Sequence, residues 1–97
     1  MARLELAPRV AQDFERIRAH LEAHQSASGE DRAREIVAAP EALIHNPRIG
    51  RHRADGLREM VIGREQHGYL AVYRYIEPLD LVVVLGLRHQ HEAGYQD

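Results

Sequence analysis

Residues 68–89 read GYLAVYRYIEPLDLVVVLGLRH, two apolar stretches rich in β-branched and aromatic residues with a proline-containing break between them. Such stretches predict strands over residues 69–76 and 80–89, and Pro78 suits the tight turn that would join them. A third strand is expected over residues 57–63, because short glycine-bounded connections usually join antiparallel neighbours. The three segments therefore predict an antiparallel meander. Its last segment is apolar on both faces, which is typical of a central strand.

Two helices are expected before the meander. Pro8 suits a first helical position, and the apolar residues after it recur at intervals of four, three and four on a helix over residues 8–25. These residues are Val10, Phe14, Ile17 and Leu21. A second helix is expected from a Ser28 cap to about Asn46, with a kink or short break at Pro40, because proline removes a backbone hydrogen bond. Its expected buried residues are Ala33, Ile36, Val37, Leu43 and Ile44.

The remaining segments complete the expected order of elements. Residues 2–6 alternate apolar and charged side chains, which predicts a half-buried edge strand, and residues 47–56 form a polar, arginine-rich connection. Within the meander, Tyr69, Tyr73 and Tyr75 share one face of their strand. They could stack on nucleobases, but packing beneath the helices is favoured because aromatic side chains bury a large area.

Composition limits the class of protein. The chain has 97 residues, which we assign to a single domain over residues 1–97, and no cysteine, which excludes disulfides and thiolate metal sites. His20 and His24 have the spacing of a zinc pair, but no third ligand is placed near them, so we predict no metal site. No apolar run approaches the roughly 20 residues that span a bilayer. Arg3 and Glu5 stand where the apolar core of a signal peptide would begin. We therefore expect a cytoplasmic protein without membrane contact.

The charge balance argues against a nucleic-acid partner. The chain has 13 arginines, no lysine and 15 acidic residues, which gives a formal net charge of -2. A protein that docks on RNA or duplex DNA usually carries a basic surface, because neutralising phosphates supplies much of the affinity. Such a surface could still form locally between residues 47 and 64. This segment holds Arg48, Arg51, Arg53, Arg58 and Arg64.

Four motifs, in this order, resemble those of the RelE/ParE family of type II toxin–antitoxin toxins. They are NPRIGR (residues 46–51), LRE (57–59), GYLAVYR (68–74) and VVLGLRHQH (83–91). The resemblance extends over nearly the whole chain. It implies an α+β fold of order β-α-α-β-β-β, in which a helical hairpin packs on a small, mainly antiparallel sheet. It also implies a cognate antitoxin as partner in a heteromeric complex, and no cofactor.

The family has two branches that differ in their targets. ParE-like toxins poison DNA gyrase without chemistry of their own, whereas RelE-like toxins cut mRNA on the ribosome. RelE-like toxins are typically strongly basic, so the negative charge and the absence of lysine favour the ParE-like branch. The alternatives are a RelE-like endoribonuclease and a weakly toxic member that retains antitoxin binding. In the endoribonuclease, the resemblance implies these candidate catalytic residues: Arg58, Arg64, Arg88, His89, His91 and Tyr95.

These candidates also have structural interpretations. Arg58 could contact a phosphate, or it could form an ion pair within the fold, for example with an acid of the first helix. His89, His91 and Tyr95 could supply the acid and base that 2′-hydroxyl attack requires, or they could belong to a solvated tail.

Overall fold

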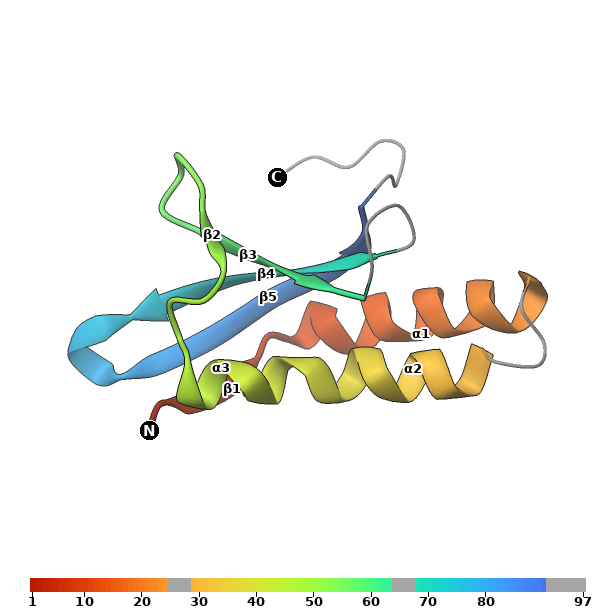
Figure 1. Cartoon of the computed structure of the whole chain (residues 1–97), viewed down its shortest axis with the longest axis horizontal. Helices are drawn as coiled ribbons and strands as arrows, with labels where there is room; N and C mark the ends of the chain where they lie inside the picture. Colours follow the sequence, from red (N-terminus) through yellow and green to blue (C-terminus); the bar gives the residue numbers. More distant parts are fainter. Residues whose placement is uncertain (25–28, 64–67, 91–97) are drawn as a thin grey trace.

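Two long helices lie side by side against one face of a five-stranded sheet (Figure 1). The computed structural model of the chain describes residues 1–24, 29–63 and 68–90. Its elements are β1 (Arg3–Leu6), α1 (Pro8–His24), α2 (Gly29–Ala38), η1 (Ala39–Glu41), α3 (Ala42–His45), β2 (Arg51–His52), β3 (Arg58–Ile62), β4 (Tyr69–Ile76), η3 (Glu77–Leu79) and β5 (Leu81–His89). No helix within the described residues is long and apolar enough to cross a membrane. The layered arrangement confirms the expected α+β fold.

The sheet has the strand order β1-β5-β4-β3-β2. The antiparallel meander β3-β4-β5 is confirmed, and β1 is the expected edge strand, paired in parallel with β5. The expected half-burial of β1 is wrong, because three of its four residues are exposed, including Leu6. Two further details differ from the expectation. Arg51 and His52 form β2 by pairing with Glu59 and Arg58, so the arginine-rich connection contributes a strand of its own. Because this strand adds to the far edge, β4 is the middle strand and β5 lies beside it.

The helical hairpin follows the apolar pattern except at Val37 and Ile44. The predicted interruption at Pro40 is confirmed, since the short helix η1 separates α2 from α3 at this point. Ser28, the expected cap, lies outside the described residues. Val37 was expected in the core but is 53% exposed, because it sits a third of a turn away from the buried Ile36. Ile44 is only partly buried.

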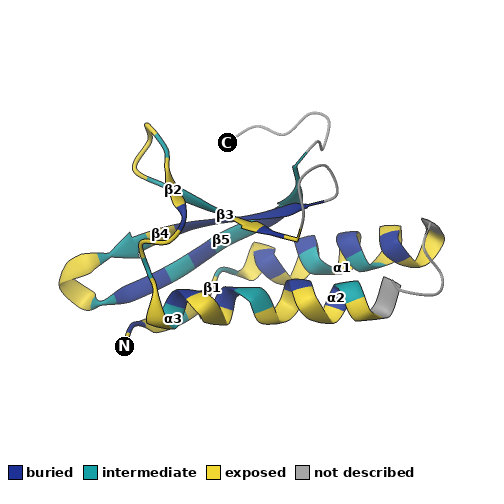
Figure 2. Cartoon of the chain, in the orientation of Figure 1, coloured by how far each residue is buried: buried dark blue, intermediate teal, exposed yellow. Residues whose placement is uncertain are grey.

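The core fills the space between the helix pair and the sheet. Buried residues are concentrated on β4 and β5 and alternate with exposed ones along α1 and α2 (Figure 2). The expected stripe of α1 contributes Val10, Ile17 and Leu21, with Phe14 packed against them. Tyr69 and Tyr73 belong to this core, which confirms the packing interpretation of the tyrosines. Tyr75 is partly buried and packs at its margin.

Candidate functional site

The connection between α3 and β2 is held in place by Tyr73 and Arg58. The hydroxyl of Tyr73 donates a hydrogen bond to the carbonyl of Pro47 at 2.8 Å and accepts one from the N–H of Gly50 at 2.8 Å. The guanidinium of Arg58 donates to the carbonyls of Gly50 and Arg48, at 3.0 and 3.2 Å. Arg58 therefore has a role inside the fold, but its partners are backbone carbonyls and not the acid of the first helix that was suggested.

Only glycine fits at position 50. A Cβ atom there would lie 2.6 Å from both the ring and the hydroxyl oxygen of Tyr73, closer than van der Waals contact allows. Burial raises the pKa of Tyr73, although the hydrogen bond from Gly50 and the charge of Arg58 oppose the rise. The tyrosine therefore stays a neutral phenol, able to donate and accept at the same time.

We predict that Arg58→Ala lowers the free energy of unfolding by about 1–2 kcal/mol, because two carbonyls lose a charged donor in a partly exposed setting. Arg58→Lys should recover part of the loss, since an ammonium can still donate to one of them. Arg74→Ala is the matched control, because Arg74 is exposed on the adjacent strand. Urea denaturation measures all three variants. Unchanged stability in Arg58→Ala, together with lost toxicity, would instead indicate that Arg58 contacts the target.

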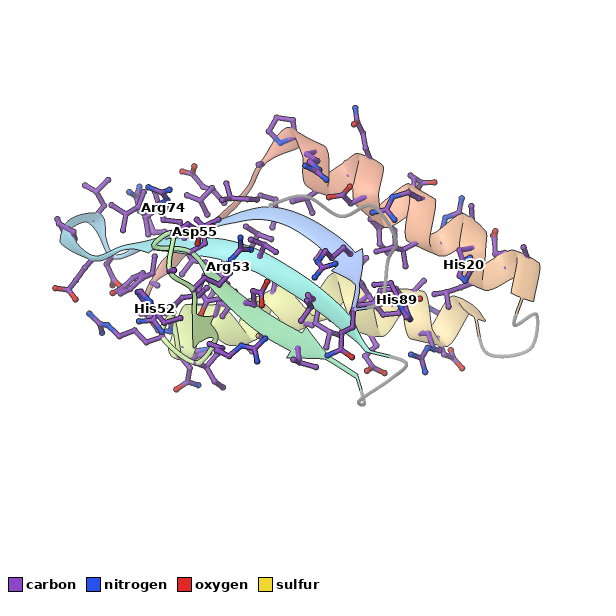
Figure 3. All side chains as sticks on the ribbon, turned by 90° about the horizontal axis from the view of Figure 1, so that it is seen from above. His20, His52, Arg53, Asp55, Arg74 and His89 are labelled. Carbon is purple, nitrogen blue, oxygen red and sulfur yellow. The ribbon has the colours of Figure 1, made fainter. Side chains whose placement is uncertain are left out.

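The other arginines that the structure describes between residues 47 and 63 form ion pairs with the chain's own acids. Glu59 accepts from Arg51 and from Arg53, each at 3.2 Å, and Arg53 also pairs with Asp55 at 2.7 Å. The side chains of Arg53 and Glu59 are only 12% and 10% exposed. These residues line a shallow, open hollow of about 400 Å³ at the hairpin that joins β2 to β3, where Figure 3 labels Arg53 and Asp55.

Arg48 is also engaged within the fold. Its guanidinium forms an ion pair with Glu77 and lies over the ring of Tyr75, 5.0 Å from the ring centroid. The hydroxyl of Tyr75 donates in turn to Asp80 at 2.7 Å, at the turn between β4 and β5. Within the described part of the segment, Arg48, Arg51 and Arg53 are therefore each paired with a carboxylate of the chain itself. Arg64, the remaining candidate in it, lies outside the described residues.

The strand register keeps apart the predicted catalytic residues that the structure describes. His89 pairs with Tyr69 and Arg88 pairs with Leu70, so the two neighbours point to opposite faces of the sheet. On β3, Arg58 lies four residues from the residue that pairs with Tyr69. At ~3.3 Å per residue, these two positions on β3 are about 13 Å apart. The structure therefore does not bring Arg58, Arg88 and His89 together. His91 and Tyr95 lie outside the described residues.

One buried charge was missed by the sequence analysis. Asp13 is 5% exposed, and its carboxylate accepts from the N–H of Leu87 at 3.0 Å and pairs with Arg9 and Arg16, each at 3.4 Å. Arg16 also donates to the carbonyl of Leu87 at 3.2 Å. The pairing of β1 with β5 stops at Val84. Beyond that residue, the side chains of Asp13 and Arg16 on α1 provide the hydrogen-bond partners for the backbone of β5 that β1 does not provide. The sequence signal that could have revealed this charge is an aspartate within the apolar stripe of the first helix.

A metal centre receives no support from the described residues. They contain no group of three or more histidine, cysteine, aspartate or glutamate side chains that could hold a metal ion. His20 is exposed on α1, and the side chain of His24 lies outside the described part of the chain.

Comparison with known proteins gives concordant matches. Residues 4–94 match a family model described as ParE toxin of type II toxin-antitoxin system, parDE. The chain is 32% identical over 93 residues to Toxin RelE3 of Caulobacter vibrioides, with 95% of this chain and 98% of that protein covered. Its fold is similar to that of the chromosomal ParDE system from P. aeruginosa, with a TM-score of 0.74, 18% identity and coverage of 92% and 96% of the two chains. It is also similar to the intact E. coli RelBE toxin–antitoxin complex, with a TM-score of 0.59, 17% identity and coverage of 95% and 100%.

Proposed function

Because the chain belongs to the ParE toxin family of type II toxin–antitoxin systems, we propose that it is a ParE-like poison of DNA gyrase. In this proposal it acts by binding, in the cytoplasm, and a cognate antitoxin holds it inactive. The solved relatives described as the ParDE system and the RelBE complex support an antitoxin as partner.

The observation that carries the proposal is the internal pairing of the arginine-rich segment. A ribonuclease that docks on the ribosome needs cations available to phosphates. Here Arg48, Arg51 and Arg53 pair with carboxylates of the same chain, and Arg58 donates to backbone carbonyls. With a formal net charge of -2, this arrangement favours a protein surface over RNA as the target.

A second candidate function is a RelE-like endoribonuclease, which the relative named Toxin RelE3 favours. Its catalytic groups would come from Arg58, Arg64, Arg88, His89, His91 and Tyr95. Arg88 and His89 point to opposite faces of the sheet, which does not favour a shared role of the two at one phosphate. Under the ParE-like proposal the same residues belong to a binding surface.

The decisive experiment compares the two targets in purified systems. We expect the protein to inhibit supercoiling of relaxed plasmid by DNA gyrase, and to leave mRNA uncut in a reconstituted translation reaction examined by primer extension. Heat-denatured toxin and toxin preincubated with antitoxin serve as controls. Codon-positioned cuts in mRNA with intact supercoiling would overturn the proposal in favour of the ribonuclease. Inactivity in both systems, with antitoxin binding retained, would indicate a weakly toxic family member.

A further inference from the structure

The outer side of β1 is an open edge of the sheet. In the strand order β1-β5-β4-β3-β2, β1 has a neighbouring strand on one side only. The N–H groups of Arg3 and Ala7 donate to backbone carbonyls on the β5 side, each at 2.9 Å. Because alternate residues of a parallel strand bond to the same neighbour, the N–H and C=O groups of Leu4 and Leu6 point away from β5. Such an edge is a template for pairing with another strand.

The side chains of β1 place opposite charges on either side of one leucine. Arg3 and Glu5 are both exposed, and neither has an ion-pair partner within the described residues. Leu4, between them, packs against the core, whereas Leu6 is 55% exposed. The edge therefore carries two charges of opposite sign that the fold itself does not pair.

We propose that β1 pairs in antiparallel fashion with β1 of a second copy of the chain, about a twofold axis through Leu4. In this register the two Leu4 residues exchange backbone hydrogen bonds, and Arg3 of each copy lies opposite Glu5 of the other. Opposite residues in such a non-hydrogen-bonded position have their Cα atoms about 4.5 Å apart, so their unlike charges attract. The two five-stranded sheets join into one. The inference concerns assembly of the chain with itself and does not depend on its target.

The residues of β1 favour this register over its neighbours. An axis through Glu5 would place the two Glu5 carboxylates opposite each other, which is unfavourable. An axis through Leu6 would place Pro8 opposite Leu4, where proline has no N–H to donate to the ladder. Only the axis through Leu4 brings unlike charges together twice.

The same register brings exposed apolar side chains together. Beyond the shared ladder, Leu6 of one copy approaches the start of β1 in the other. Leu79 lies at that start, because the next residue accepts from the N–H of Arg3, and it is 57% exposed. The N–H of Ala2 is already bonded to the carbonyl of Ile44 at 2.9 Å, so the shared ladder stops before Ala2. A ladder this short predicts a weak dimer that forms at high protein concentration.

Charge reversal at the two exposed positions tests the pairing. Arg3→Glu and Glu5→Arg each place like charges opposite each other in both symmetric pairs, so either should raise the dissociation constant of the dimer about tenfold or more. The double variant Arg3→Glu/Glu5→Arg restores unlike pairs and should dimerise like the wild type. Arg74→Glu, which reverses an exposed charge on β4, is the matched control and should leave the constant unchanged. Sedimentation equilibrium at low salt measures the constants, and circular dichroism checks that each variant is folded.

An equimolar mixture of the two single variants provides the most specific probe. Its mixed dimer has unlike charges in both pairs, so the mixture should associate more tightly than either variant alone. A chain that stays monomeric at all concentrations overturns the inference, as does a dimer that Arg3→Glu weakens no more than Arg74→Glu. A monomeric toxin whose binding to the antitoxin is weakened by Arg3→Glu would also overturn it, because the edge would then receive an antitoxin strand.

Discussion

Tyr73→Phe is expected to lower the free energy of unfolding by about 2–4 kcal/mol, because removal of one hydroxyl leaves two backbone groups without their partner. The N–H of Gly50 and the carbonyl of Pro47 both bond to that hydroxyl, and Tyr73 is fully buried. A domain of this size is stable by only about 5–15 kcal/mol, so the loss is large. Urea denaturation followed by circular dichroism measures it.

Tyr75→Phe is the matched control for this change. Tyr75 lies on the same strand, and its hydroxyl bonds to the side chain of Asp80 at the margin of the core, where water can replace it. Loss of the Tyr75 hydroxyl should therefore lower the free energy of unfolding much less than loss of the Tyr73 hydroxyl does. Equal costs for the two variants would show that the connection between α3 and β2 is not held by Tyr73.

Asp13→Ala is expected to lower the free energy of unfolding by about 2–4 kcal/mol. The substitution leaves the buried N–H of Leu87 without an acceptor, and Arg16 loses the carboxylate that orients it. The partially exposed arginines can turn to solvent, which keeps the cost below that of a fully buried ion pair. Thermal and urea denaturation of the purified toxin provide the measurement.

Two further variants assign that cost to its source. Asp13→Asn retains an acceptor for Leu87 while removing the charge, so it should recover the part of the loss that belongs to the backbone hydrogen bond. Asp31→Ala removes an aspartate from an exposed ion pair on α2, and we expect no measurable change. If Asp13→Ala behaved like Asp31→Ala, the end of β5 would not depend on α1 for its hydrogen bonding.

Much of the fold follows from short-range patterns in the chain. The spacing of Val10, Ile17 and Leu21 specifies α1, and the β-branched residues of 81–89 specify β5, because helix and strand periodicity depend on nearby residues. The interruption at Pro40 is equally local, since it arises from the missing N–H of proline. The four motifs that indicated the family are likewise contiguous stretches.

The candidate site depends on contacts that no local pattern contains. Whether Arg88 and His89 share a face with Arg58 depends on the register between β3, β4 and β5. The partners of the arginines are likewise set by the fold, which brings Glu77 to Arg48 and the carbonyl of Gly50 to Arg58.

The same holds for Asp13, whose charge in an apolar stripe has no explanation until α1 packs against Leu87 at the end of β5. Sequence periodicity therefore determined the long helices and strands and most of their apolar faces, but not the short strand β2. Only strand pairing and helix docking, which join residues far apart in the chain, determined which charged side chains meet.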